Sequence, residues 1–386
     1  MGRPYLRRAH DRGLEVAVLD RPEAFTWPET KEALGPADRT YPVSGRDYEA
    51  WLSGASRALA DGSVEGVIAF SEPHVLAAAM VAEELGLPGP GVRAALVSRN
   101  KVAQRELFYR SGLPQPGFHV ARDVESALAW TGGSWPVVVK PVSGSGSLGV
   151  RIVHGEHEMR TWFTERDSEE PALVEEYLDH PEYSVEAVTD HGSVVFSSVT
   201  AKTTGPRPFF VETEHRIPAD QDADDLLRGV VRALGMGSGI LHLEYRDAPG
   251  GPRIMEVAVR TPGDYILDAV EAALEVDLYD AVVAVACGEQ PSRIQPSQGT
   301  AAVWFPTPEP GEVVDIVGVD AVTSHEGVVK VEIDVEPGST VHPMRSSMDR
   351  VGVVIVRADT PDVLEARLKT VREELGFRTV PPGEGR

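Results

Sequence analysis

The sequence predicts a mixed α/β protein built from more than one packed unit, and three observations support this prediction. At 386 residues the chain is longer than one ordinary domain. Its N-terminal part alternates helical patterns with short apolar runs, which is typical of a parallel sheet covered by helices. Its C-terminal part is rich in valine interrupted by glycine and proline turns, which favours β structure.

The N-terminal part should begin with a helix. We expect helices over residues 4–12, 47–60 and 73–85, and strands over residues 14–19 and 64–70. A doubly wound unit usually opens with a strand, whereas this chain opens directly on a helix. Either the first strand is missing from the sequence, or the sheet is one strand short.

The middle part predicts a small lobe followed by longer strands. Asn100 is expected to cap a helix over residues 101–110. The other expected elements are helices over 124–130 and 222–234, a largely helical stretch over 266–287, strands over 137–140, 150–153, 172–175, 183–189 and 194–200, and a hairpin of strands 240–246 and 253–259. Beyond these we expect strands over 301–305, 313–316, 328–335 and 351–358, a helix over 361–375 and a disordered tail over 381–386.

The composition excludes several classes of function. Lys and Arg total 37 and Asp and Glu total 60, so the net charge is −23. This argues against nucleic acid or an anionic membrane as partner, although acidity can also serve solubility alone. The single cysteine, Cys287, excludes an intramolecular disulfide and a Cys₄ zinc site, and its apolar neighbours predict a buried, inert thiol. We find no membrane-length apolar run and no signal core, so we expect a cytoplasmic protein.

A Gly/Ser-rich loop follows a short apolar strand that ends in a lysine. Residues 143–149 read SGSGSLG and come just after Lys140. Small residues with free backbone N–H groups suit close approach to phosphate oxygens, and a lysine that continues a buried strand is costly unless an anion meets it. The spacing matches neither the P-loop nor the dinucleotide-binding motif. The loop alone is equally a β-hairpin turn, so Lys140 carries the prediction of a phosphate site.

Several acidic residues lie at strand ends or on adjacent strands. Glu175 and Glu176 end one strand and Glu182 follows; they form either a solvated edge or a hinge that offers its backbone to adenine and a carboxylate to ribose. Glu244 and Glu256 lie on the two strands of the predicted hairpin, where two carboxylates repel unless a cation lies between them. Mg²⁺ bound by one or two carboxylates and substrate phosphates fits such a pair. The alternative is a set of salt bridges to Arg246, Arg253 and Arg260.

Taken in order, these residues resemble the ATP-grasp superfamily. Each motif is weak alone, but their order and spacing are specific and cover most of the chain. Within the superfamily the chain looks most like the carboxylate–amine ligases of the L-amino-acid (dipeptide) ligase group. This second resemblance rests on residues 209–218 (FFVETEHRIP), 242–244 (HLE), 263–264 (GD) and 341–345 (VHPMR).

The resemblance implies an α/β (α+β) ATP-grasp fold in three parts. These are an N-terminal parallel α/β (pre-ATP-grasp) domain over 1–95, an ATP-grasp domain over 96–290 with a lid lobe at about 116–178, and a C-terminal β-rich lobe over 291–386. It also implies ATP, Mg²⁺ or Mn²⁺, and small-molecule carboxylate and amine substrates, and it allows a homodimer.

By the same resemblance, three groups of residues form the site. Lys101 and Lys140 would bind the ATP phosphates, Glu175 or the backbone of Glu176 and Leu178 the adenine, and Glu182 the ribose. The whole nucleotide set is Lys101, Lys140, Ser143, Gly144, Ser145, Gly146, Ser147, Glu175, Glu176, Leu178, Glu182 and Lys202, the last reaching the γ-phosphate. Glu244 and Glu256 would ligate the metal. The substrate and catalytic set is Arg260, Lys140, His215 and Gly263, although a lone histidine in a loop is more often incidental.

One residue departs from the family pattern Glu-x-Asn-x-Arg, because Ala258 stands at the asparagine position. A methyl group cannot coordinate a metal, so water replaces that ligand, a second Mg²⁺ binds weakly, or activity is altered. The resemblance implies a ligase that forms an amide through an acyl phosphate. The alternatives are a carboxylase of the same fold, either purine-pathway or bicarbonate-activating, and a non-catalytic nucleotide-binding protein. The acid and the amine are not readable from the sequence.

Overall fold

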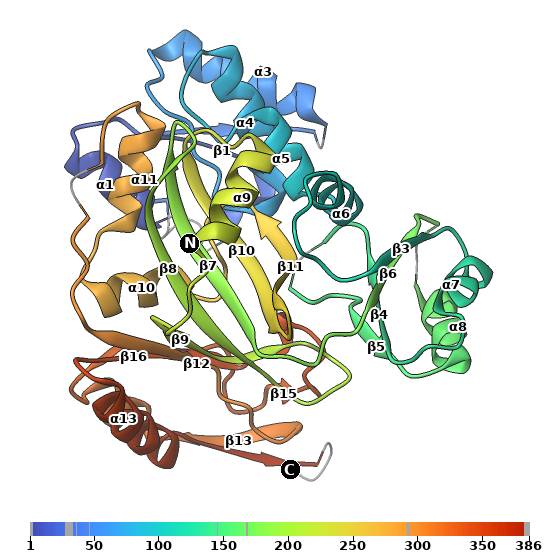
Figure 1. Ribbon diagram of the computed structural model, residues 1–386. Helices are drawn as coiled ribbons and strands as arrows, with labels where there is room; N and C mark the ends of the chain where they lie inside the picture. The colour runs from blue at the N-terminus through green and yellow to red at the C-terminus, as the bar shows by residue number, and fades with distance from the viewer. Residues whose placement is uncertain are drawn as a thin grey trace.

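An eight-stranded antiparallel sheet forms the centre of the protein (Figure 1). The computed structural model describes residues 3–27, 34–35, 37–45, 47–144, 146–166, 169–291 and 294–381. The strand order is β11-β10-β7-β8-β9-β12-β16-β14. In chain order the strands are β7 (Glu182–Asp190), β8 (Ser193–Thr204), β9 (Glu212–Ile217), β10 (Gly239–Ala248), β11 (Gly251–Ala258), β12 (Thr300–Trp304), β14 (Val328–Ile333) and β16 (Gly352–Ala358).

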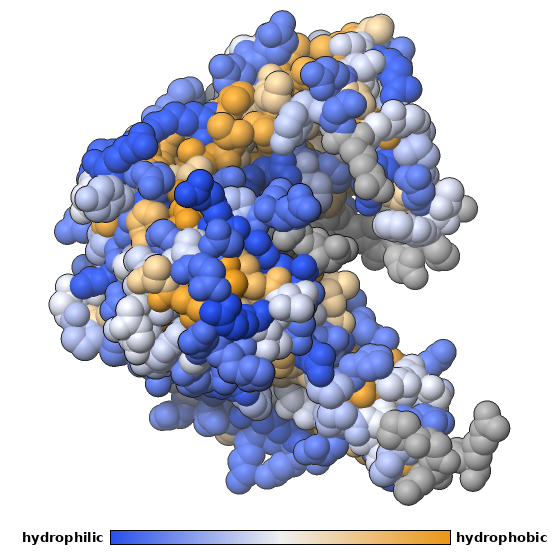
Figure 2. Space-filling view, turned by 90° about the vertical axis from the view of Figure 1, so that its right-hand side faces the viewer, coloured by the Kyte–Doolittle hydropathy of each residue, from blue (hydrophilic) through white to orange (hydrophobic). Residues whose placement is uncertain are grey.

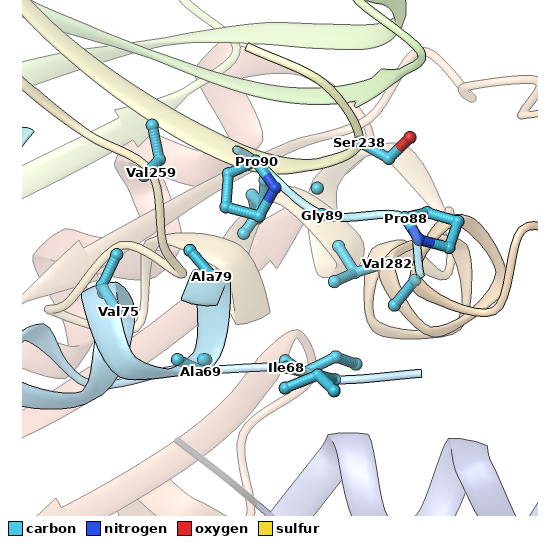
Figure 3. Close-up of a pocket in the computed structure, with 15 residues that line it drawn as sticks. Ile68, Ala69, Val75, Ala79, Pro88, Gly89, Pro90, Ser238, Val259 and Val282 are labelled. Atoms are coloured by element: carbon cyan, nitrogen blue, oxygen red, sulfur yellow. The ribbon is translucent and has the colours of Figure 1, made fainter. Parts of the chain in front are cut away.

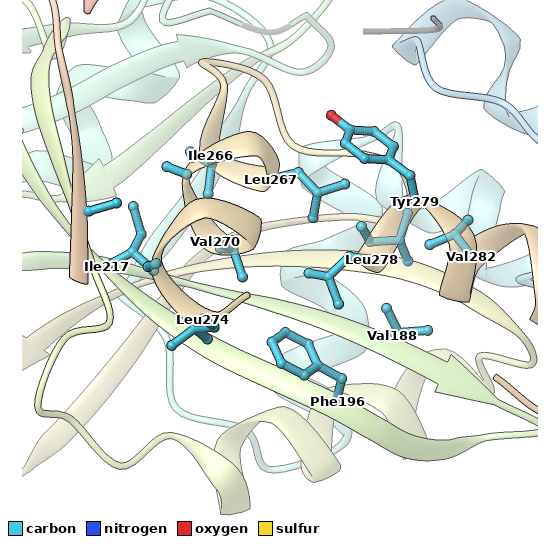
Figure 4. Close-up of a cluster of buried hydrophobic side chains, with 14 of the residues drawn as sticks. Val188, Phe196, Ile217, Ile266, Leu267, Val270, Leu274, Leu278, Tyr279 and Val282 are labelled. Atoms are coloured by element: carbon cyan, nitrogen blue, oxygen red, sulfur yellow. The ribbon is translucent and has the colours of Figure 1, made fainter. Parts of the chain in front are cut away.

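Helices bury both faces of this sheet. On one face, α10 (Ile266–Leu274) and α11 (Leu278–Ala286) pack with the N-terminal helix α1 (Arg3–Asp11) in an apolar cluster that includes Leu267 and Phe196 (Figure 4). On the other face, α9 (Asp224–Leu234) buries five apolar residues against β10 and β11. The helices α4 (Val75–Glu84), α5 (Val92–Ser98) and α6 (Lys101–Arg110) complete that second cluster.

A small lobe stands beside the edge strand β11 (Figure 1). Its four-stranded sheet has the order β3-β6-β4-β5, and its two helices pack together over an apolar cluster of their own. Its elements are β3 (Phe118–Ala121), α7 (Val124–Thr131), β4 (Val137–Pro141), β5 (Arg151–Val153), α8 (Glu156–Glu165) and β6 (Ala172–Glu176). The Gly/Ser loop connects β4 to β5, which pair as antiparallel strands.

The strand predicted over residues 64–70 is wrong, because this segment carries no strand pairing. It lies against α11 instead: a Cβ atom added at Gly66 would come within 2.9 Å of the Cys287 sulfur, and Ile68 and Phe70 pack on the cluster around α11. In the described part, the N-terminal sheet therefore has only the parallel pair β1 (Ala17–Asp20) and β2 (Arg39–Pro42), beside α3 (Tyr48–Asp61). Cys287, predicted to be buried, is half-buried.

The C-terminal strands extend the central sheet. The strand β12 pairs with β9, and α13 (Pro361–Glu374) covers β12 and β16 through a further apolar cluster. A three-stranded sheet of β15 (Thr340–Val341), β13 (Gly311–Val317) and β17 (Gly376–Val380) and the short helix α12 (Val319–Thr323) complete this part. Residues 382–386 of the predicted disordered tail lie outside the described residues. The domain limits at residues 95 and 290 remain predictions.

Other differences from the sequence-based expectations have local causes. The helix predicted over 266–287 is two helices, because Glu275 adopts a left-handed conformation (φ 53°) and Asp277 caps α11. The loop expected around His215 is the strand β9 (ETEHRI), which pairs with β8 and β12. No helix among the described residues is long and apolar enough to cross a membrane.

Candidate active site

The predicted site residues meet around one cavity between the small lobe and the central sheet. The cavity has a volume of about 200 Å³. The small lobe contributes Lys140 and the Gly/Ser loop, the sheet contributes the charged side chains of β7, β8, β10 and β11, and Ser347 enters from the C-terminal part. A deep indentation is visible in the surface on the side of the small lobe (Figure 2).

A second, apolar cavity of about 40 Å³ lies elsewhere (Figure 3). Residues 67–69, 88–90 and 238–240 contribute to its wall together with α4 and α11. Among the described residues that line it, Ser238 has the only polar side chain. It lacks the charged groups that bind a nucleotide, so the larger cavity is the candidate site.

Lys140 lies at the small-lobe side of the site. Its Nζ atom is 2.7 Å from Oε2 of Glu175, whose Oε1 accepts a 2.5 Å hydrogen bond from Nε of Arg105. Burial alone would raise the pKa of Glu175, but the two cations lower it to about 2. Glu175 is wholly buried and is absent from the cavity lining, as is Glu176, whereas Leu178 lines the cavity.

Lys101 connects the Gly/Ser loop to the central sheet. Asn100 caps α6, as predicted, by accepting a 2.9 Å hydrogen bond from the Ala103 backbone. At the first position of this helix, Nζ of Lys101 donates to the Gly144 carbonyl (2.8 Å) and to Oε1 of Glu256 (3.0 Å). The described loop residues Ser143, Gly144, Gly146 and Ser147 line the cavity, and Ser145 lies outside the described residues.

Glu244 and Glu256 lie on the adjacent strands β10 and β11, as the sequence predicts, and a register shift after Glu244 makes them direct cross-strand partners. The alternative set of arginine salt bridges is not formed among the described residues: Arg246 pairs with Glu182, and Arg260 pairs with Glu72. Each of these glutamates forms a salt bridge with a lysine instead. Glu256 meets Lys101, and Glu244 meets Lys202.

Lys202 lies among three carboxylates. Its Nζ atom contacts Glu244 and is 3.1 Å from Glu212 and 3.8 Å from Glu182, and its side chain is 2% exposed. The ligand oxygens of the three glutamates lie within 4.8 Å of one another. Burial opposes the charge on Lys202, but the three carboxylates raise its pKa well above the ordinary value. Glu212 was not predicted as a site residue, because its contact with Lys202 depends on the pairing of β9 with β8.

Arg246 holds the segment that follows β6. Its guanidinium donates to the carbonyls of Leu178 (2.9 Å) and His180 (3.1 Å) and to Glu182 (2.5 Å). Arg246 thus fixes the segment that was predicted to be a hinge to β10. The sequence had indicated Arg246 only as a candidate for a salt bridge. Glu182 lines the cavity next to this segment.

His215 does not line the cavity, contrary to its predicted contact with substrate. It is wholly buried on β9, with Nε2 3.5 Å from Oδ2 of Asp264. Asp264 and the predicted Gly263 do line the cavity. Arg350, which the sequence did not single out, donates to both oxygens of Asp264 at 2.6 and 3.1 Å and to Glu212 at 3.1 Å.

His242 bridges Glu186 and Glu244 in the floor of the site. Nδ1 is 2.9 Å from Glu186 and Nε2 is 3.2 Å from Glu244. Burial would lower the pKa of His242, but the two carboxylates raise it to about 9. The positive charge of His242 therefore stabilises the folded protein fully below the ordinary value of 6.5 and is lost as the pH rises through about 9.

We expect the free energy of unfolding of the ligand-free protein to fall by up to about 3 kcal/mol between these two pH values, since one pKa unit corresponds to about 1.4 kcal/mol. Urea unfolding followed by tryptophan fluorescence on both sides of this range measures the change. The His242→Gln variant is the control, and it should show a flatter profile. An equally steep fall in this variant would assign the effect to another group.

The carboxylates of this cavity fit a divalent cation that prefers oxygen ligands. Glu244 and Glu256 approach from adjacent strands, and the cluster around Glu244 already surrounds a cationic ammonium group. Ala258 lines the same cavity two residues after Glu256, and its side chain offers no ligand atom. Arg260 also lines it and donates to Glu72 at 2.6 Å.

The fold and this set of residues define an ATP-grasp protein. The family model of the ATP-grasp domain matches residues 133–268, and that of the ATP-grasp N-terminal domain matches residues 6–89. The model of the L-amino acid ligase C-terminal domain 2 matches residues 303–380. The chain therefore belongs to the ATP-grasp superfamily and, within it, to the L-amino-acid ligase group.

Individual relatives agree with this grouping. The crystal structure of an L-amino acid ligase from Bacillus licheniformis superimposes with a TM-score of 0.82 at 24% identity, over 98% of this chain and 96% of that one. An L-arginine-specific L-amino acid ligase of Bacillus subtilis is 23% identical over 74% of this chain and 73% of its own length. The uncharacterized protein y4rH of Sinorhizobium fredii is 28% identical over 88% and 73%.

Proposed function

We propose that the protein is an ATP-dependent carboxylate–amine ligase that joins an amino acid to a carboxylic acid or to a second amino acid. The observation that carries this proposal is that two lysines, Lys101 and Lys140, and two carboxylates, Glu244 and Glu256, line one cavity. This arrangement suits a nucleotide triphosphate with a divalent cation. Membership of the L-amino-acid ligase group supports the choice of reaction.

In the proposed reaction, a carboxylate oxygen of the acid attacks the γ-phosphorus of ATP in line. The bond from phosphorus to the bridging oxygen breaks, and ADP leaves with the electron pair. The resulting acyl phosphate is attacked at its carbonyl carbon by the amine, which gives up a proton as the amide forms and phosphate departs. A Mg²⁺ or Mn²⁺ ion on Glu244 and Glu256 supplies positive charge to the phosphate oxygens when bound.

The protein's own residues act mainly by position and charge. Lys101 and Lys140 offset the negative charge of the phosphates, and Arg260 steadies the transferred phosphoryl group. The backbone near Leu178 receives adenine and Glu182 receives ribose. The Gly/Ser loop closes over the phosphates from the small lobe and keeps water from the acyl phosphate.

The two alternatives are less well supported. A carboxylase shares this fold, but the match over residues 303–380 is to a C-terminal domain of L-amino acid ligases. A non-catalytic nucleotide-binding protein would explain Ala258. It would not explain why Lys140, Glu256 and Arg260 are all retained around the cavity.

The test is phosphate release from ATP and Mg²⁺ across pairs of amino acids and related acids, with Glu256→Gln as the control. Release that requires both an acid and an amine, together with one new amide mass, is the expected result and names the substrates. Tight ATP binding without release for any pair would favour the non-catalytic alternative, and bicarbonate-dependent release would favour the carboxylase.

A further inference from the structure

Three charged side chains form a buried network of ion pairs beside the cavity. In order they are Arg105, Glu175 and Lys140, and their side chains are 1%, 0% and 7% exposed. One carboxylate oxygen of Glu175 accepts from Arg105, and the other lies 2.7 Å from the Lys140 ammonium. Only Lys140 of the three lines the cavity.

This network of ion pairs joins the small lobe to the central sheet. Lys140 and Glu175 lie on the adjacent strands β4 and β6 of the small lobe. Arg105 lies on α6, which packs on the central sheet, and its Nη2 donates at 2.8 Å to the carbonyl of Met255, the residue before Glu256. Glu175 therefore links the lysine of the small lobe to the strand that carries a proposed metal ligand.

We propose that Glu175 is a positioning residue for Lys140, and that Arg105 anchors Glu175 so that the ammonium is directed at the phosphates. This inference rests on the proposed function, which makes Lys140 a phosphate ligand. It replaces the adenine contact that the resemblance implies for Glu175. Both carboxylate oxygens of Glu175 face cations, and its side chain is absent from the cavity lining.

Glu175 also keeps Lys140 charged. The charged groups that face Lys140 are Glu175 from β6, and Arg105 and Lys101 from α6. Burial lowers the pKa of Lys140, the two cations lower it further, and Glu175 opposes them. Without the negative charge of Glu175 every remaining influence disfavours the ammonium. Lys140 then loses its proton closer to neutral pH and with it the attraction for phosphate.

The experiment measures binding of ATP and of inorganic tripolyphosphate by calorimetry between about pH 7 and about pH 9, a range well below the ordinary lysine pKa. Four proteins are compared: wild type, Glu175→Gln, Lys140→Arg and the double variant. The wild-type profile is the reference, because the ligand phosphates themselves titrate over part of this range. Relative to wild type, Glu175→Gln should lose at least about tenfold affinity for both ligands as the pH rises, since tenfold corresponds to one pKa unit.

The double variant separates titration of Lys140 from general damage. A guanidinium does not deprotonate in this range, so Glu175→Gln with Lys140→Arg should show the same profile as Lys140→Arg alone. A Glu175→Gln profile parallel to wild type would overturn the inference. Adenosine gives an independent check: weaker adenosine binding with unchanged tripolyphosphate binding would restore the adenine role and overturn the proposal.

Two further outcomes are distinguishable. A wild-type protein that binds neither ATP nor tripolyphosphate would overturn the proposed function together with this inference. If Glu175→Gln does not fold, Glu175→Asp takes its place, because it keeps the charge but shortens the reach to Lys140. Its profile should stay parallel to that of wild type while tripolyphosphate affinity falls several-fold, and unchanged affinity would overturn the positioning role.

Discussion

Replacing Glu256 by alanine is expected to lower kcat for amide formation by at least about 10²–10³-fold, the loss typical of removing one preorganised electrostatic group from an active site. Glu256 lies opposite Glu244 across β10 and β11, where the two carboxylates define the proposed metal site. The substitution also leaves the Lys101 ammonium without its 3.0 Å partner. Single-turnover phosphate release with a substrate pair measures the effect.

A matched control is available on the surface. Glu84 ends α4 with an exposed side chain outside the cavity lining, so Glu84→Ala should leave kcat unchanged. Electron paramagnetic resonance of Mn²⁺ with ATP gives a second readout, and Glu256→Ala should weaken Mn²⁺ binding. Near-normal turnover in this variant would remove Glu256 from the metal site.

The parts of the fold that could be predicted are those whose signals are local. The hairpin of β10 and β11 follows from two apolar runs around a Pro-Gly-Gly turn, and the Asn100 cap follows from its position before α6. The strand predicted over residues 64–70 is wrong, because whether this segment pairs with another strand depends on parts of the molecule distant in the sequence. Its apolar residues are buried against α11. An apolar pattern indicates burial, but it does not indicate whether a buried extended segment has a partner strand.

The candidate site also combines local features that could be predicted with long-range contacts that could not. The predicted hairpin was enough to place Glu244 and Glu256 on adjacent strands, but their direct pairing depends on a register shift between Glu244 and Tyr245 that no sequence pattern indicated. The role of Glu175 could not be read in this way. Its partner Arg105 lies 70 positions away in the sequence on another element. Arg350 was missed likewise, because its contact with Asp264 joins segments 86 residues apart.

Replacing Lys202 by methionine is expected to destabilise the ligand-free protein by about 3–5 kcal/mol, the usual cost of removing one partner from a buried ionic group. The Lys202 ammonium is the shared cation of Glu182, Glu212 and Glu244, and its side chain is 2% exposed. Methionine fills much the same volume, so lost charge rather than a void causes the change. Urea unfolding at neutral pH measures it.

A lysine in an exposed pair supplies the comparison. Lys369 lies 3.9 Å from Glu373 with 73% of its side chain exposed, so Lys369→Met should cost less than about 1 kcal/mol.

Added Mg²⁺ then distinguishes lost charge from lost packing. The ligand oxygens of the three glutamates lie within 4.8 Å of one another, so a divalent cation can replace the missing ammonium in Lys202→Met. Because an ion that binds only the folded state raises its stability, Mg²⁺ should raise the melting temperature of Lys202→Met more than that of wild type. Equal stability of Lys202→Met and wild type without Mg²⁺ would contradict the shared-cation account.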